Sequence, residues 1–188
     1  MKIHDLHFSF ADNVIFDGLD MEITDGKITA IMAPSGKGKS TLLRLMAGLI
    51  QPQSGSIDIG NQKVGIMFQE PRLFGQLTAL QNVMLVIKQK HGKKERALEL
   101  LDAFGVADAA DKYPDELSGG MAKRVSLARA IAYNPDILLL DEPFSALDSD
   151  TKKQIIAQTK RLVDGKSVIL VTHDLAEAHA FADYTITL

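Results

Sequence analysis

The first thirty residues alternate apolar and polar positions over short stretches, a pattern typical of strands that bury one face. Turn-forming residues divide these stretches at positions 11–13 and 25–26, which predicts antiparallel strands. From residue 28 onward the pattern changes to short, continuous apolar runs that alternate with amphipathic stretches. Such runs are typical of a parallel sheet that helices cover on both faces, so the chain is predicted to have an α/β fold with an antiparallel part at its N-terminus.

The same pattern predicts the individual elements. Strands are expected over residues 28–32, 137–140, 167–171 and 184–188, and a turn at 52–55 should lead into a hairpin-like stretch over 56–68. Helices are expected over residues 40–49, 77–90, 94–104, 119–133, 149–163 and from 174. Thr78 and Gln81 have capping-box spacing, while Gly105 and Gly165 should end the helices before them. We predict a core domain over 1–69 and 117–188 and a small helical lobe over 70–116.

Composition narrows the classes of function. The chain has 188 residues, of which 46% are apolar, enough for one compact domain with a small lobe attached. Its formal charge of -3 gives no reason to expect a nucleic-acid partner, and the absence of cysteine excludes disulfides and thiolate metal sites. The start lacks a signal-peptide core and the apolar runs are too short to span a bilayer. We expect a soluble, cytoplasmic protein that would act at a membrane only as a peripheral protein.

The stretch 33–41, A-P-S-G-K-G-K-S-T, stands between an apolar strand and a helix, the context of a phosphate-binding P-loop. Glycines allow backbone N–H groups to point inward at an anion, and the helix N-terminus adds positive charge. Lys39 should reach the terminal phosphates of ATP and Ser40 should ligate Mg²⁺. Ala33 replaces the usual first glycine, which is acceptable if its φ is negative. The predicted ATP-binding residues of this loop are Ser35, Gly36, Lys37, Gly38, Lys39, Ser40 and Thr41.

Two carboxylates, Asp141 and Glu142, follow the apolar run 137–140. Ligands of open α/β sheets bind at the carboxyl ends of the strands. Asp141 is therefore a candidate to hold Mg²⁺ through water, and Glu142 to orient or deprotonate an attacking water. A solvated carboxylate pair is the alternative, but the P-loop in the same chain favours catalysis. The pattern predicts a P-loop NTPase core.

Residues 117–121, L-S-G-G-M, resemble the L-S-G-G-Q signature of ATP-binding-cassette (ABC) ATPases. Other motifs of that family occur in its order along the chain. Gln69 resembles the Q-loop glutamine, 145–148 the D-loop, and His173 the switch histidine. Phe10 matches the aromatic residue that stacks on adenine, although a core position is an alternative. Residues 65–73 resemble importer cassettes, especially those for nitrate, sulfonate and taurine-like solutes.

The resemblance implies a mechanism. Two cassettes would enclose ATP head to tail, with the P-loop of one facing Ser118, Gly119 and Gly120 of the other. Glu142 would handle the water, His173 would contact the γ-phosphate, and Gln69 would sense metal and water. The implied partners are a second cassette, with a homodimer expected, and separate transmembrane permease subunits at the inner face of the cell membrane.

The chain departs from the family pattern at three further places. Lys37 is a basic residue inside the phosphate loop and could add attraction for phosphate. Met121 replaces the signature glutamine, which should weaken nucleotide-dependent pairing while hydrolysis is retained. The chain also ends at Leu188, so a C-terminal regulatory domain is not expected.

Three alternatives to a transporter subunit remain. A soluble single cassette could act in an assembly process, and a nucleotide-gated module could bind ATP without hydrolysing it. Glu142 and His173 argue against the second of these. A P-loop kinase would have no use for residues 117–120.

Overall fold

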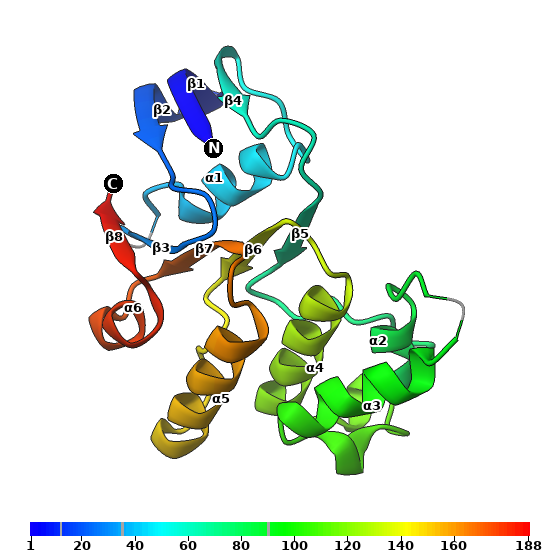
Figure 1. Ribbon diagram of the computed structural model, residues 1–188. Helices are drawn as coiled ribbons and strands as arrows, with labels where there is room; N and C mark the ends of the chain where they lie inside the picture. Colours follow the sequence, from blue (N-terminus) through cyan, green and yellow to red (C-terminus); the bar gives the residue numbers. More distant parts are fainter. Residues whose placement is uncertain (12, 35, 90) are drawn as a thin grey trace. The chain divides into compact units, whose positions relative to one another are not determined.

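The computed structural model describes residues 1–11, 13–34, 36–89 and 91–188. The chain divides into two compact units (Figure 1). Unit 1 contains Met1–Ile66, Asp136–Asp141 and Gly165–Leu188, and unit 2 contains Met67–Pro135 and Glu142–Asp164. Within the described residues, no helix combines the length and the apolar character needed to cross a membrane.

Unit 1 begins with an antiparallel sheet in the order β2-β1-β4. Strands β1 (Lys2–Phe10) and β2 (Asn13–Glu22) form the predicted antiparallel pair, with Lys2 opposite Glu22 and Phe10 opposite Asn13. Asp12, in the predicted turn between them, lies outside the described residues. The sheet packs one face on a core of apolar side chains that come mainly from β1, β2 and the first helix.

The second sheet has five strands in the order β5-β6-β7-β3-β8. These are β5 (Val64–Met67), β6 (Ile137–Asp141), β7 (Ser167–Thr172), β3 (Ile28–Met32) and β8 (Tyr184–Thr187). The pairs β6–β7, β7–β3 and β3–β8 are parallel, as predicted. Every residue of β6 and β7 is buried, as expected for parallel strands covered on both faces.

The predicted hairpin over residues 56–68 is wrong. β4 (Ser54–Asp58) pairs with β1 in the antiparallel sheet, where Ile57 lies opposite Ile3. The start of β5 is instead tied to β6, because Lys63 N donates to the Asp136 carboxylate at 2.8 Å and Lys63 O accepts from Asp136 N at 2.8 Å. β4 and β5, although adjacent in the sequence, therefore belong to two different sheets. Each pairs with a strand that is distant along the chain.

Two helices complete unit 1. Helix α1 (Lys39–Met46) packs on β6, and α6 (Leu175–Phe181) packs on β7 and β3. The Asp174 side chain caps α6 by accepting from Ala176 N and Glu177 N. Helix α1 is shorter than the predicted 40–49, because Gly48 adopts a left-handed conformation (φ 66°) that ends the helix.

Unit 2 consists mainly of helices. It contains α2 (Ala79–Met84), α3 (Lys93–Ala103), α4 (Gly119–Ala132) and α5 (Ser149–Leu162), and α2, α3 and α4 pack on one another. Two short 3-10 helices, η1 (Ala107–Ala109) and η2 (Pro114–Glu116), precede α4. The prediction of a separate lobe over 70–116 stays a prediction, since unit 2 also includes α4 and α5.

The start of α2 is confirmed and its predicted length is wrong. Thr78 and Gln81 form the full capping box, but the helix ends at Met84 instead of residue 90. Leu85, which caps the helix, is 54% exposed, whereas Ile87 is buried without being helical. Lys90, the last residue of the predicted helix, lies outside the described residues.

Candidate functional site

The loop between β3 and α1 has the backbone that phosphate binding requires. Gly36 (φ 83°) and Gly38 (φ 81°) both adopt left-handed conformations, which glycine accepts at little cost. Ala33 has no positive φ, which meets the condition under which alanine can replace the first glycine. Ser35, a predicted ligand, lies outside the described residues. The loop thus leads into α1 with Gly38 as the N-cap.

Lys39 is buried within this loop, with only 7% of its surface exposed. Its ammonium group donates to the carbonyl oxygens of Ala33 at 2.6 Å and Pro34 at 3.0 Å. The positive charge is thereby held on the inner side of the loop. Lys37 is exposed, Ser40 is half-buried and Thr41 is buried. Of the two lysines in the loop, Lys39 is the one that the backbone holds in place.

The phosphate loop and two predicted site residues lie at one edge of the parallel sheet. The phosphate loop follows β3, His173 follows β7, and Asp141 ends β6. The strands are in register, with Met32 opposite Thr172 and Asp141 opposite Val171. Because parallel strands end at the same edge, the loop, Asp141 and His173 lie along it together. Asp141 is buried, whereas His173 is exposed.

The antiparallel hairpin packs on the phosphate loop. A Cβ added to Gly38 would collide with the Ile15 side chain of β2 and lie 3.0 Å from Phe16 Cζ. Phe10, at the turn end of the same hairpin, is 48% exposed, which excludes the core position considered for it. Its ring meets that of Phe8 edge-on, with the centroids 4.9 Å apart. An exposed aromatic ring thus stands on the hairpin that covers the loop.

In unit 2, Gln69 and Glu142 are in direct contact. The Gln69 side-chain amide donates from Nε2 to Glu142 Oε2 at 3.1 Å. Glu142 has a φ of 46°, a conformation that is costly for a residue with a side chain and that clusters at functional sites. Its carbonyl oxygen accepts from both the hydroxyl of Ser145, at 2.9 Å, and the Ser145 N–H, at 3.3 Å. A strained, hydrogen-bonded turn therefore sets where the Glu142 carboxylate lies.

The signature residues form the N-terminus of α4. Ser118 is the N-cap, and its hydroxyl accepts from Met121 N at 3.3 Å. Ser118 and Gly119 are exposed and Gly120 is half-buried. A Cβ at Gly120 would lie 3.4 Å from the Ala146 carbonyl oxygen, an ordinary van der Waals contact. An exposed helix N-terminus without bulky side chains is open to an anion.

Comparison with known proteins identifies the family. Residues 16–145 match the protein family described as ABC transporter. The chain belongs to this family. The aliphatic sulfonates import ATP-binding protein SsuB 1 of Mesorhizobium japonicum is 42% identical over 95% of this chain and 71% of its own length. The sulfate/thiosulfate import ATP-binding protein CysA of Synechocystis is 39% identical over 99% of this chain and 57% of its own length.

A solved structure agrees with this assignment. The ATP-binding cassette MJ0796, seen as a dimer in a post-hydrolysis state bound to ADP and Pi, has a TM-score of 0.88 at 34% identity. The match covers 100% of this chain and 93% of that cassette. The predicted P-loop NTPase fold is therefore confirmed, and this ABC cassette is an ATP-binding, ATP-hydrolysing transporter subunit.

Sequence reasoning missed a buried charge that contacts a predicted site residue. Lys123, on the first turns of α4, is 5% exposed and donates to Gln69 O at 2.8 Å and Ser145 Oγ at 2.7 Å. The available signal was a polar residue every third position on a helix, at 123, 126 and 129. This spacing marks one helix face, but it does not say which backbone the face contacts.

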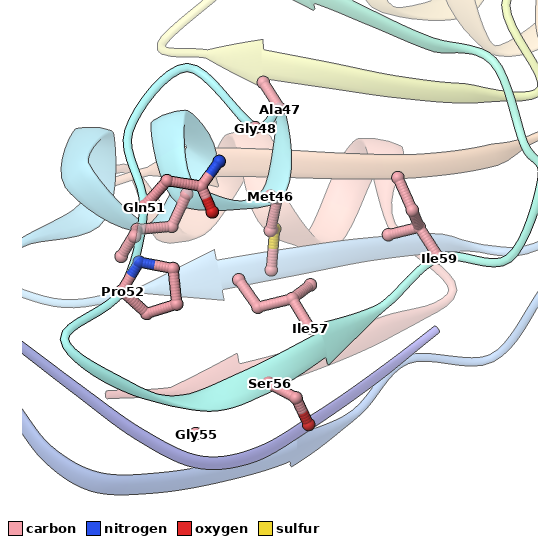
Figure 2. A pocket seen from close by; sticks show the side chains of 10 residues that line it. Met46, Ala47, Gly48, Gln51, Pro52, Gly55, Ser56, Ile57 and Ile59 are labelled. Carbon is pink, nitrogen blue, oxygen red and sulfur yellow. The ribbon is translucent and has the colours of Figure 1, made fainter.

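A cavity of about 320 Å³ lies elsewhere in unit 1, between the C-terminal end of α1 and β4. Figure 2 shows Met46, Pro52 and Ile57 around it. Helix α1 begins at Lys39, beside the phosphate loop, and ends at Met46, beside the cavity. With a rise of about 1.5 Å per residue, the length of the helix separates the two. The cavity is therefore not part of the candidate ATP site.

Proposed function

We propose that this ABC cassette energises the import of a sulfonate or a related sulfur oxyanion. It would work as a pair of cassettes bound to separate membrane-spanning subunits at the inner face of the cell membrane. The observation that carries this proposal is the similarity of about 40%, over essentially the whole chain, to cassettes named for aliphatic sulfonate and sulfate/thiosulfate import.

The phosphate loop would bind the triphosphate of ATP. Backbone N–H groups around Gly36 and Gly38 form an anion site, and Lys39 supplies a charge already fixed inside the loop. The exposed ring of Phe10 would stack on adenine. The remaining ligands of the loop would be Ser35, Lys37, Ser40 and Thr41.

The predicted metal ligands also suit Mg²⁺. A hydroxyl from Ser40, a carboxylate from Asp141 and the amide oxygen of Gln69 are hard oxygen donors, and Mg²⁺ is usually held by few protein ligands together with water and phosphate. Ser40 and Asp141 belong to segments that the parallel strands bring to one edge. When bound, Mg²⁺ would neutralise charge on the phosphates.

Glu142 would orient or deprotonate the attacking water, since its carboxylate follows the buried strand β6 directly. Gln69 would hold that carboxylate in place through the hydrogen bond between them, and His173 would contact the γ-phosphate. Ser118, Gly119 and Gly120 of a second copy would close on the same phosphate with their helix N-terminus. Each chain carries both halves of such a site, so a homodimer suffices.

The experiment is purification of the tagged cassette from native membranes, followed by reconstitution of the captured complex in vesicles. We expect a polytopic membrane protein to co-purify with the cassette. In the vesicles, an aliphatic sulfonate supplied together with the protein that binds it should raise the rate of ATP hydrolysis. Capture of soluble assembly proteins instead would contradict the transport proposal. A complex stimulated only by an unrelated solute would contradict the sulfonate part alone.

A further inference from the structure

The strongest unassigned feature is the buried ammonium group of Lys123. This residue lies three positions after Gly120, on the helix that begins at the signature, and is 5% exposed. It donates to two oxygen atoms from separate segments, Gln69 O at 2.8 Å and Ser145 Oγ at 2.7 Å. Burying a charge is costly unless hydrogen bonds satisfy it, so these two bonds fix the geometry of three segments at once.

The second bond continues to Glu142. The Ser145 hydroxyl accepts from Lys123 and donates to Glu142 O at 2.9 Å. Hydrogen bonds in series polarise and strengthen one another, so Lys123 and Glu142 are connected through a single hydroxyl. One ammonium therefore holds the main chain of Gln69 directly and that of Glu142 through Ser145, while the two side chains meet at 3.1 Å.

Two other residues of the same face of α4 provide a contrast. Ser126 Oγ donates to Pro71 O at 3.0 Å, and Arg129 donates to Pro71 O and Arg72 O, each at 2.9 Å. The segment after Gln69 is thus bonded along the helix at positions spaced by three. Ser126 and Arg129 thus bond to Pro71 and Arg72, whereas Lys123 bonds to Gln69 and Ser145, on both sides of the Gln69–Glu142 contact.

We infer that Lys123 is a positioning residue for ATP hydrolysis. It fixes the positions of Gln69 and Glu142 relative to each other and links both to the helix that carries Ser118–Gly120. The inference rests on the proposed roles of Gln69 and Glu142. A signature helix that shifts would move the Gln69 carbonyl and the Ser145 hydroxyl with it. Lys123 acts through these residues and does not itself contact the nucleotide.

The test compares steady-state ATP hydrolysis of Lys123→Met with that of Ser126→Ala. The first keeps the apolar stem and removes both bonds, and the second removes one bond on the same face of the helix. We expect Lys123→Met to lower kcat by about 10- to 100-fold, the loss that small misplacements of reacting groups cause, with KM for ATP changed less than about twofold. Ser126→Ala should stay within about twofold of the wild type in both constants. Lys123→Gln, which retains N–H donors, should recover part of kcat.

A double-mutant cycle with Ser145→Ala tests the route. If Lys123 acts through Ser145, the two changes should be clearly non-additive in kcat. An unchanged kcat in Lys123→Met, a loss equal to that in Ser126→Ala, or strict additivity with Ser145→Ala would overturn the inference. Where Lys123→Met does not fold, as judged by circular dichroism, Lys123→Gln and the cycle built on it carry the same test. Full hydrolysis by Glu142→Gln would instead refute the proposed function, so the two failures are distinguishable.

Discussion

The side-chain amide of Gln69 donates to the carboxylate of Glu142 across 3.1 Å, although 73 positions separate them in the chain. Because the amide nitrogen faces Glu142, the amide oxygen is the group that Gln69 can offer to a cation or water. Gln69 and the Glu142 carboxylate are therefore one structural pair. The positive φ of Glu142 shows that the fold accepts local strain to keep this carboxylate in place.

The two lysines of the phosphate loop should differ in their effect on ATP binding. Lys39 is buried and held by Ala33 O and Pro34 O, whereas Lys37 is exposed. Lys39→Met removes a fixed charge-assisted donor and should weaken ATP binding by about 10- to 100-fold. Lys37→Met should weaken it only about twofold to threefold, since a solvated charge attracts phosphate less. Calorimetric titration in a Glu142→Gln background measures both, and equal losses would contradict the assignment of Lys39.

Gly38 and Gly36 form a matched pair for stability. Both have a positive φ, which should cost alanine about 1 kcal/mol. Nothing lies within 4 Å of a Cβ at Gly36, while one at Gly38 would collide with Ile15. Gly36→Ala should therefore lower the free energy of unfolding by about 1 kcal/mol, and Gly38→Ala by about 2–4 kcal/mol because of the added overpacking. Urea unfolding tests this, and equal destabilisation would show that β2 does not pack tightly on the loop.

Met121 should limit nucleotide-dependent pairing of cassettes. It stands in the first turn of α4, half-buried beside the exposed Ser118 and Gly119, where a polar side chain could support the partner contact. Met121→Gln should lower the ATP concentration needed for half-maximal dimerisation by about threefold to tenfold, the worth of one hydrogen bond. Gel filtration of Glu142→Gln, with and without the added substitution, provides the comparison. An unchanged midpoint would mean that residue 121 has no part in pairing.

His7 should make the hairpin sensitive to pH. Its Nε2 lies 3.0 Å from Asp5 Oδ1 and its Nδ1 lies 3.0 Å from Asp17 Oδ1, so both ring nitrogens donate only in the charged form. The hydrogen bond to Asp5 is the largest cause that raises the pKa of His7 above 6.5. Desolvation lowers the pKa, and the charges of Asp5 and Asp17 and the hydrogen bond to Asp17 raise it further. The native state therefore favours the protonated ring. The contribution to stability is complete below pH 6.5 and is lost as the pH rises through the raised pKa.

Titration of the His7 ring by NMR checks this directly. The wild type should titrate above pH 6.5, and Asp17→Asn should move the midpoint downward. The Tm advantage of the wild type over His7→Gln should shrink as the pH rises through that midpoint. A wild-type midpoint at or below 6.5 would show that the carboxylates do not stabilise the imidazolium.

Features that depend on neighbouring residues were predictable from the sequence. The strand over 28–32, the glycine loop and the cap of α2 were predicted because each depends on residues within a few positions. The partners of β4 and β5 were not, because sheet pairing is decided by strands far away along the chain. The extra turns expected after Met84 are absent although Ile87 is buried, because a buried apolar side chain does not by itself specify a helix.

The same distinction applies to the site. Motifs named Gln69 and Glu142 separately, but their hydrogen bond depends on two segments that meet only in the fold. Lys123 belongs to none of the motifs named above, and composition and spacing do not reveal that a lysine is buried and bonded to neutral oxygen atoms. A buried charge that positions other site residues is therefore identified from the structure and not from the sequence.

We expect this cassette to hydrolyse ATP with Glu142 acting on the attacking water. Phosphate release by the wild type and by Glu142→Gln, with ATP binding measured on the same samples, tests it most directly. The substitution keeps the shape of the side chain and removes the carboxylate, so hydrolysis should fall by at least about 100-fold while the Kd for ATP changes little. Hydrolysis by Glu142→Gln at the wild-type rate, with normal ATP binding, would contradict the account.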